Sequence, residues 1–122
     1  MNGEKVLVTG CNGFIGSHLT LQLLTEGYQV VGLDILPATQ AQNIQSFISN
    51  TSFTYLEGDV TNQSLIDSTV DASFSKIFHL AARVGIERYM ENPIDVVRTN
   101  VVGTLNVIEA SLRHGCYLFF SS

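Results

Sequence analysis

Short apolar runs alternate with longer segments of helical periodicity along the whole chain. The runs are rich in β-branched and aromatic residues, which is typical of strands covered on both faces of a parallel sheet. We expect five such strands, over residues 5–9, 29–33, 53–57, 76–80 and 117–120. No internal repeat, low-complexity tract or linker-like break divides the sequence, so residues 1–122 are expected to belong to one domain.

Residues 14–26 are expected to form the first helix. Side chains spaced four apart would give it one apolar face, formed by Ile15, Leu19 and Leu23. Gly27 follows where a glycine in the left-handed conformation commonly ends a helix. The polar residues 35–50 predict at most a short helix, over residues 41–48.

A second helix is expected to run from a cap at Thr61 or Asn62 through Val70. The clearest helical signal follows the fourth strand, where Asn92 is the expected cap and Pro93 the first helical residue. An apolar stripe and a closing glycine mark the rest of this helix. The stripe consists of Val97, Val101, Leu105, Ile108 and Leu112.

The alternation of strands and helices indicates repeated βαβ units, and their right-handed crossovers place helices on both faces of a parallel sheet. If the chain doubles back after the third strand, the strand order is 3-2-1-4-5. We therefore expect an α/β fold with a doubly wound parallel sheet that is truncated after its fifth strand. A ligand crevice would then lie outside the carboxyl ends of strands one and four.

Composition and charge exclude several classes of protein. Hydrophobic residues make up 45% of the chain and charged residues 14%, which argues against intrinsic disorder. The net charge is -5, and no Lys or Arg lies between Lys5 and Lys76, so nucleic acid is not expected as a partner. No apolar run is long enough to span a bilayer. Cys11 and Cys116 form neither a disulfide scaffold nor a metal site, and we expect a soluble, cytoplasmic protein.

Gly10, Gly13 and Gly16 form a G-x-x-G-x-x-G turn that directly follows a strand and opens a helix. Glycines at these positions allow a tight turn and a close approach of the backbone to a pyrophosphate, while the helix N-terminus presents free N–H groups. Taken alone, the spacing also fits a glycine-rich turn without a ligand. Between a strand and a helix, and followed by an acid, it predicts dinucleotide binding.

That acid is Asp34, which ends the second strand. It lies at about the 20-residue offset at which a carboxylate accepts hydrogen bonds from the adenosine ribose. A carboxylate there repels a 2′-phosphate, and no nearby base is available to pair with one, so NAD is expected rather than NADP. The alternative interpretation is a solvated acid at a strand end.

Five stretches of the chain match one family pattern in order: T-G-C-N-G-F-I-G at 9–16, G-D-V-T at 58–61, H-L-A-A at 79–82, T-N-V-V-G-T at 99–104 and F-S-S at 120–122. Together they resemble the extended short-chain dehydrogenases/reductases, the NAD-dependent epimerase/dehydratase family, whose members have a Rossmann fold. The resemblance covers essentially the whole chain and identifies it as an N-terminal fragment.

The resemblance implies a role for each matched position. The glycine turn and helix start would cradle the pyrophosphate, Asp34 would bind the adenosine ribose, and Asn100 would be a structural and cofactor-side hydrogen-bonding group. The pyrophosphate set is Gly10, Asn12, Gly13, Phe14, Ile15 and Gly16. Asp59 and Val60 would hold adenine, and Leu80, Ala81 and Ala82 would pass beneath the nicotinamide ribose. From the residues alone, Asp59 also fits a turn acid, and 80–82 also fit a buried strand exit.

The loop after the fourth strand would approach the substrate. Arg83 and Arg88 are candidates to bind the diphosphate of a nucleotide sugar. The alternative is that they are surface arginines paired with neighbouring glutamates. His18 and His79 are expected to pack on a helix and in the strand core, and Cys11 to fill space in the turn.

The chain carries none of the family's catalytic residues. Members use a Ser or Thr followed by a Y-x-x-x-K pair, in which the lysine lowers the pKa of the tyrosine that acts as general base. None of the 4 tyrosines here has a lysine four residues later. We therefore expect residues 1–122 to be the NAD-binding part only, without the catalytic and substrate-binding regions and inactive alone.

The resemblance implies a parent enzyme that transiently oxidises the hydroxyl of a nucleotide sugar by hydride transfer to NAD. It also suggests a homodimer. Two alternatives are a non-catalytic protein of the same fold that senses dinucleotides, and a structural βαβ domain without a ligand.

Overall fold

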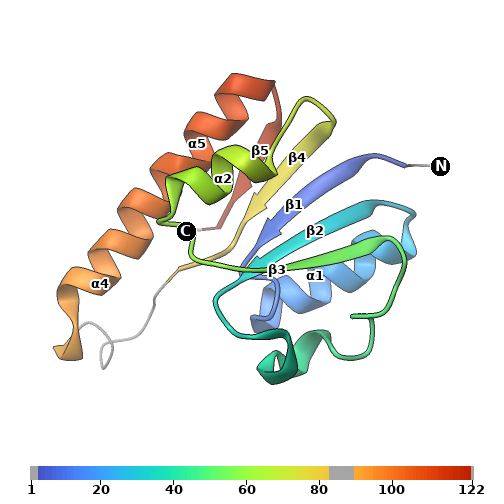
Figure 1. Ribbon diagram of the computed structural model, residues 1–122, viewed down its shortest axis with the longest axis horizontal. Coiled ribbons are helices and arrows are strands. Elements are labelled where there is room, and N and C mark those ends of the chain that lie inside the picture. Colours follow the sequence, from blue (N-terminus) through green and yellow to red (C-terminus); the bar gives the residue numbers. More distant parts are fainter. Residues whose placement is uncertain (1–2, 83–89, 122) are drawn as a thin grey trace.

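A five-stranded parallel sheet forms the centre of the computed structural model, which describes residues 3–82 and 90–121 (Figure 1). The strands are β1 (Lys5–Thr9), β2 (Gln29–Asp34), β3 (Phe53–Glu57), β4 (Phe74–His79) and β5 (Tyr117–Phe120). Their order across the sheet is β3-β2-β1-β4-β5, and every neighbouring pair is parallel. The doubly wound order predicted from the sequence is confirmed. All carboxyl ends of the strands therefore lie at one edge of the sheet.

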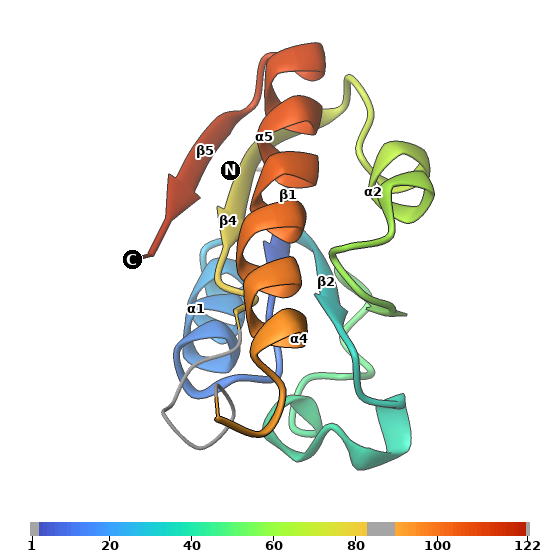
Figure 2. The ribbon, with the colours of Figure 1, turned by 90° about the vertical axis from the view of Figure 1, so that its left-hand side faces the viewer.

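Helices cover both faces of this sheet (Figure 1). They are α1 (Phe14–Thr25), α2 (Gln63–Thr69), α4 (Pro93–Val97) and α5 (Gly103–His114), with a π-helical turn, η3, at Arg98–Val102. Figure 2 shows α4, η3 and α5 as one continuous column beside β4 and β5. Two 3₁₀ turns, η1 (Ala38–Gln40) and η2 (Gln42–Ile44), lie between β2 and β3. In the part of the chain that the structure describes, no helix is long and apolar enough to cross a membrane.

Each face of the sheet has its own core, because successive side chains of a strand point to opposite faces. Leu7 of β1 packs with Ile66 of α2 and Val107 of α5 on one face. Val6 and Val8 pack in a second cluster on the other face, together with residues of α1, β2 and the segment before β3. Both faces are thus covered, which is why the strand runs of this sequence are almost continuously apolar.

The helix ends agree with the capping signals of the sequence. The side chain of Asn62 accepts a hydrogen bond from the Leu65 amide, so Asn62, and not Thr61, caps α2. Asn92 caps α4 in the same way through the Asp95 amide. Gly115 ends α5 in the left-handed conformation, with φ of 68°.

The apolar face predicted for the first helix is confirmed at Leu23, which is buried, and at Leu19, which packs against the core, but it is wrong at Ile15, which is 61% exposed. The same helix, α1, also buries Gly16, Ser17 and Thr20. The apolar stripe predicted for the last helix is wrong. The expected stripe of the last helix is largely exposed, and that helix buries a row of mostly small residues: Gly103, Asn106, Val107, Ala110 and Ser111. Small residues occupy the buried positions because they allow the helix axes to lie close to the sheet and its loops. A Cβ added to Gly103 would lie 2.5 Å from Cγ2 of Val60.

Two other boundaries differ from the prediction. Residues 41–48 do not form an α-helix, and the segment is built from η1, η2 and turns. The side-chain Nε2 of Gln45 donates to the carbonyls of Ala38 (2.8 Å) and Ala41 (2.9 Å), so local side-chain bonds compete with helical pairing. The fourth strand begins at Phe74, two residues earlier than expected, and ends at His79.

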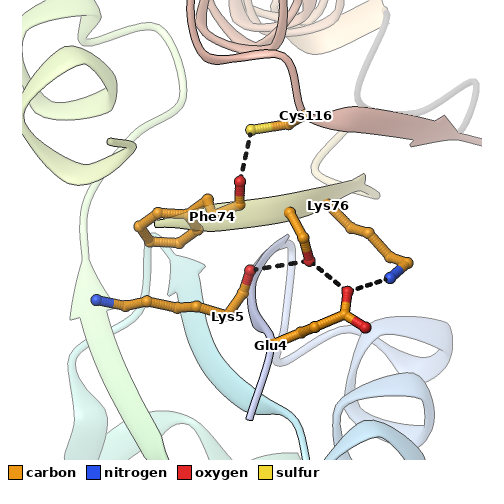
Figure 3. A network of polar contacts seen from close by, with 6 residues as sticks. Glu4, Lys5, Phe74, Lys76 and Cys116 are labelled. Atoms are coloured by element: carbon orange, nitrogen blue, oxygen red, sulfur yellow. Dashed lines mark hydrogen bonds and ion pairs between the residues drawn. The ribbon is translucent and has the colours of Figure 1, made fainter. Parts of the chain in front are cut away.

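A polar network joins the amino ends of β1 and β4, at the edge of the sheet opposite the carboxyl ends (Figure 3). The Glu4 carboxylate accepts hydrogen bonds from Nζ of Lys76 (2.7 Å) and from the Ser75 hydroxyl (2.8 Å). These bonds hold the pKa of Glu4 below its ordinary value. The Cys116 thiol donates to the Phe74 carbonyl (3.4 Å). The network ties the amino ends of β1 and β4 together and lies at the edge of the sheet opposite the carboxyl ends of the strands.

Candidate functional site

The glycine turn starts where β1 ends, and its first glycine lies against the end of β4. Gly10 has φ of 72°, and a Cβ added there would lie 2.9 Å from the backbone N of Ala81. A side chain is excluded twice at this position, by the left-handed conformation and by the neighbouring backbone. The Gly10 amide donates to the Leu33 carbonyl (2.8 Å), so the turn is also attached to β2.

The third glycine lets α1 pack on the turn that precedes it. A Cβ added to Gly16 would lie 2.0 Å from the Gly10 carbonyl oxygen. The Gly13 amide donates to that same carbonyl (3.0 Å), which closes the turn. Gly13 is the N-cap of α1 and has no side chain that could accept from the first-turn amides. The amino end of α1 therefore keeps N–H groups for an external acceptor.

Phe14 and Ile15 contribute backbone rather than side chains to this helix start. Their side chains are 77% and 61% exposed, and neither lines the cleft described below. The Phe14 ring packs on His18, with 4.7 Å between ring centroids. His18 is itself exposed, so its expected role in helix packing is wrong. The exposed position follows from the burial of the Gly16 side of α1.

Asp34 lies directly across from the turn. Its Oδ2 accepts a hydrogen bond from the Asn12 amide (3.0 Å), and its Oδ1 accepts one from the Ile35 amide (2.8 Å). The carboxylate is half-buried. The acid and the glycine turn, which are 22 residues apart in the sequence, therefore meet at the carboxyl ends of β1 and β2.

Asn43, which the sequence does not predict as a site residue, binds the glycine turn from the side opposite Asp34. The Asn43 amide N–H donates to Oδ1 of Asn12 (2.9 Å), and its side-chain Nδ2 donates to the Asn12 carbonyl (2.8 Å). The pair joins η2 to the glycine turn by two hydrogen bonds, both donated by Asn43. No motif or periodicity in residues 35–50 marks this residue. Only the three-dimensional path of that segment reveals it.

Replacing Asn43 with alanine is expected to loosen the turn. The variant loses the Nδ2 bond to Asn12 and keeps the backbone bond, so we expect the free energy of unfolding to fall by about 1 kcal/mol. Urea unfolding followed by circular dichroism measures the change. Gln42→Ala, an exposed neighbour in the same turn, is the matched control and should unfold like the unaltered chain. Equal stability of the two variants would contradict a clamping role.

A cleft of about 330 Å³ opens at the carboxyl ends of the strands. Nine of the residues predicted from the sequence line it: Gly10, Asn12, Gly13, Asp34, Asp59, Val60, Leu80, Ala81 and Ala82. Gly16 and Asn100 do not line it, and Arg83 and Arg88 lie outside the described residues. Five lining residues had not been predicted: Leu33, Ile35, Leu36, Gly58 and Thr99. Among the described residues that line the cleft there is no lysine or arginine.

The wall after β3 is held by Asp59 and Val60. Oδ1 of Asp59 accepts hydrogen bonds from the amide and the hydroxyl of Thr61, each at 2.9 Å, so this acid does form a local turn. Val60 is 3% exposed, and its carbonyl accepts a bond from Nδ2 of Asn106 (2.8 Å). The wall is thus fixed to α5 from behind while its front lines the cleft.

The floor after β4 is fixed by a threonine of β1. The amides of Leu80 and Ala81 both donate to the Thr9 hydroxyl oxygen at 3.0 Å. Thr99, which is 7% exposed, meets the same cleft from η3, whereas its neighbour Asn100 is half-buried outside it. The sequence motif marked Asn100, and Thr99 is the residue of this turn that reaches the cleft.

Cys11 is inert in this arrangement. Its side chain is fully buried, and burial raises the pKa of the thiol well above its ordinary value. A protonated, buried thiol behaves as a small apolar group. The expectation that Cys11 fills space in the turn agrees with this position.

The residues of the cleft suit the chemistry of a dinucleotide. The uncapped amides of α1 can donate to pyrophosphate oxygens, and the Asp34 carboxylate can accept from ribose hydroxyls. The close approach at Gly10 leaves backbone, with no side chain, at the point where phosphate would lie. The lining combines these polar groups with apolar side chains such as Leu33 and Val60, against which a planar base can pack.

The doubly wound sheet, with its crevice at the carboxyl ends of β1 and β4, defines a Rossmann-type fold. Residues 7–122 match the family model described as GDP-mannose 4,6 dehydratase. The chain belongs to this family of nucleotide-sugar epimerases and dehydratases within the extended short-chain dehydrogenases/reductases.

Individual relatives agree with this family. UDP-glucose 4-epimerase of Mycolicibacterium smegmatis is 37% identical over 111 residues, which are 91% of this chain and 36% of that protein. The structure of a Thermotoga maritima UDP-glucose 4-epimerase with UDP-glucose gives a TM-score of 0.84 at 29% identity, over 97% of this chain and 37% of that one. Bordetella bronchiseptica WbmH in complex with NAD+ gives 0.80 at 26% identity, over 94% and 36%. The chain thus spans little more than a third of the length of these relatives.

Proposed function

We propose that this chain binds NAD in the cleft and serves as the dinucleotide-binding part of a nucleotide-sugar epimerase or dehydratase. One observation carries the proposal: the Asp34 carboxylate lies at the same crevice as the glycine turn that opens α1, and its Oδ2 accepts a hydrogen bond from the Asn12 amide of that turn at 3.0 Å. The WbmH complex with NAD+ supports the cofactor, and the epimerase structure with UDP-glucose supports the substrate class. When bound, NAD supplies the acceptor for a hydride from the sugar.

The chain's own residues would bind and orient the cofactor. The backbone of residues 10–16 would donate to the pyrophosphate, Asp34 would accept from the adenosine ribose, and Asp59 with Val60 would hold adenine. Leu80, Ala81 and Ala82 would lie beneath the nicotinamide ribose, and Asn100 would support that side through its backbone. Arg83 and Arg88 remain candidates for the diphosphate of the sugar nucleotide.

Asp34 should make the cleft selective for NAD over NADP. Isothermal titration of the unaltered chain is expected to show NAD binding and at least tenfold weaker NADP binding, since the carboxylate repels a 2′-phosphate. Asp34→Asn should weaken NAD binding about tenfold, the loss of one charge-assisted hydrogen bond, and should reduce the preference.

Glu109→Gln changes the net charge by the same amount at an exposed position of α5 and is the matched control. It should bind both nucleotides like the unaltered chain. No heat with either nucleotide would overturn the proposal and favour a structural domain without a ligand. Equal affinity for the two would overturn the role of Asp34 alone.

A second candidate is a non-catalytic protein that senses dinucleotides. It would use the same cofactor cleft and would lack the Y-x-x-x-K pair of the family's catalytic members. Under both candidates, residues 1–122 hold the cofactor-binding half and should not turn over UDP-glucose or GDP-mannose alone. NAD-dependent epimerisation or dehydration by this chain would contradict that division. The homodimer and the cytoplasmic location stay predictions.

A further inference from the structure

His79 links two parts of the cleft without lining it. It is the last residue of β4, is 3% exposed, and directly precedes the cleft residues Leu80 and Ala81. Its Nδ1 lies 2.7 Å from the Thr9 hydroxyl, and its Nε2 lies 3.0 Å from the Thr104 hydroxyl. Both nitrogens of a buried ring are therefore engaged, one toward the sheet and one toward α5.

The hydrogen bonds around Thr9 determine which nitrogen carries the proton. The Thr9 hydroxyl oxygen already accepts from the Leu80 and Ala81 amides, which uses both of its lone pairs, and the Leu80 amide is shared with the Thr9 carbonyl at 3.2 Å. Its own hydrogen must then be donated to Nδ1 of His79, which has to be unprotonated. The proton of the neutral ring lies on Nε2 and is donated to Thr104.

The chain of hydrogen bonds continues, with the same donor-to-acceptor direction, into the π-helical turn. The Thr104 hydroxyl, having accepted from His79, donates its hydrogen to the Asn100 carbonyl (2.7 Å). Asn100 lies in the middle of η3, next to Thr99, which lines the cleft. Isolated π turns are costly and are found mostly where function requires a local change of helix geometry. A half-buried donor that holds a carbonyl of this turn gives it one fixed position.

Packing restricts the ring as well. Phe120 of β5 lies parallel to His79, with 6.2 Å between ring centroids and 6° between planes. The ring cannot rotate away without losing this contact and both hydrogen bonds.

We propose that His79 is a positioning residue: a neutral imidazole, fixed as the Nε2–H tautomer, that ties the strand ends of β1 and β4 to η3 and so sets the distance between the cleft floor and Thr99. The link itself is a property of the fold. Its consequence for NAD affinity rests on the proposed function. Neither the family pattern nor the cleft lining assigns this role to Thr9, His79 and Thr104.

Thr104 offers a test that leaves the ring in place. Thr104→Val keeps the shape of the side chain and removes the hydroxyl, while Thr104→Ser keeps the hydroxyl. We expect Thr104→Val to speed hydrogen exchange of the amides of residues 98–102 by about tenfold and to weaken NAD binding by a similar factor, the equivalent of one buried hydrogen bond. Thr104→Ser should restore both values to within about twofold. A merely space-filling role would give the opposite order, because valine is the better isostere.

Nitrogen-15 NMR of the unaltered chain tests the tautomer without any ligand. The His79 ring should show an unprotonated Nδ1 and a protonated Nε2. The reverse tautomer, or rapid exchange between the two, would overturn the proposal, as would equal amide exchange in Thr104→Val and Thr104→Ser. If the unaltered chain shows no NAD binding, the proposed function fails, and the NMR and exchange results still decide whether the link exists.

Discussion

Replacing Gly16 with alanine is expected to lower the free energy of unfolding by about 3 kcal/mol, at the upper end of the range for overpacking. The added Cβ would lie 2.0 Å from the Gly10 carbonyl oxygen, and that atom is backbone that cannot rotate away. Either α1 or the glycine turn must then shift. Urea unfolding of the variant and the unaltered chain measures the loss.

The sign of this change is diagnostic. In a helix interior without a close contact, glycine to alanine stabilises by about 1 kcal/mol. A Gly16→Ala chain as stable as the unaltered one, or more stable, would therefore mean that the turn does not lie against α1 as described. Gln22→Ala on the exposed side of the same helix is the control, and it should change stability little.

Acid should destabilise the fold through His79 well before its carboxylates are protonated. Burial lowers the pKa of His79 from 6.5 to about 4. As pH falls below 6.5, the unfolded chain takes up a proton that the folded chain refuses until about pH 4, so unfolding becomes progressively easier across this window. The difference corresponds to about 3 kcal/mol of stability, fully present above pH 6.5 and lost by pH 4.

Stability should be measured by urea unfolding between pH 7.5 and 4 for the unaltered chain and for His79→Asn, whose amide oxygen can still accept from Thr9. The free energy of unfolding of the variant should fall less with decreasing pH, by most of the loss predicted for the unaltered chain. The pKa values of Glu4 and Asp71 are lowered in the folded chain, so the stability that these carboxylates contribute is lost only below about pH 4.5. The loss of stability between pH 6.5 and pH 4.5 is therefore expected to come from His79. NMR titration gives a second measurement, and protonation of the His79 ring near pH 6.5 in the folded chain would contradict the prediction.

The strands and their order were predictable because the local hydrophobic pattern of each strand agrees with its buried position in the sheet. Residues 5–9 and 53–57 are strands at the expected boundaries, and the doubly wound order is confirmed. Both faces of this sheet are covered, so a continuous apolar run is enough to predict a strand. It is not necessary to decide which face of the strand is buried. The capping residues Asn62 and Asn92 were predictable for a similar reason, since their bonds reach only three residues along the chain.

The buried face of the last helix was not predictable from periodicity, because its packing partner decides which side is buried. The apolar stripe of the last helix includes Val101 and Leu105, each 52% exposed, while Gly103 and Ala110 are buried. The approach of this helix to Val60 selects its smallest side chains, and that approach depends on a contact across more than 40 residues. Hydrophobic periodicity considers only the polarity of side chains. It does not consider how closely the helix backbone approaches its neighbours.

The candidate site was predictable where it is built from short motifs. Asn43 and His79 are residues whose roles could not be predicted in this way. The glycine turn and residues 80–82 come from matched stretches, Asp34 comes from its spacing after the turn, and the structure brings them to one cleft. Asn43 lies in a polar segment without periodicity, and the segment takes its shape from bonds to Asn12. His79 was expected only as a strand-core histidine, which its burial agrees with. Its two partners lie 70 and 25 residues away, so no local pattern could show the link.

The polar network around Glu4 and Lys76 also has a practical consequence. The network lies at the amino ends of β1 and β4. Because the strands are parallel and the crevice lies at their carboxyl ends, the network is remote from the crevice. Surface immobilisation or a bulky affinity tag at the amino end would therefore leave the mouth of the crevice open to nucleotides diffusing in from solution.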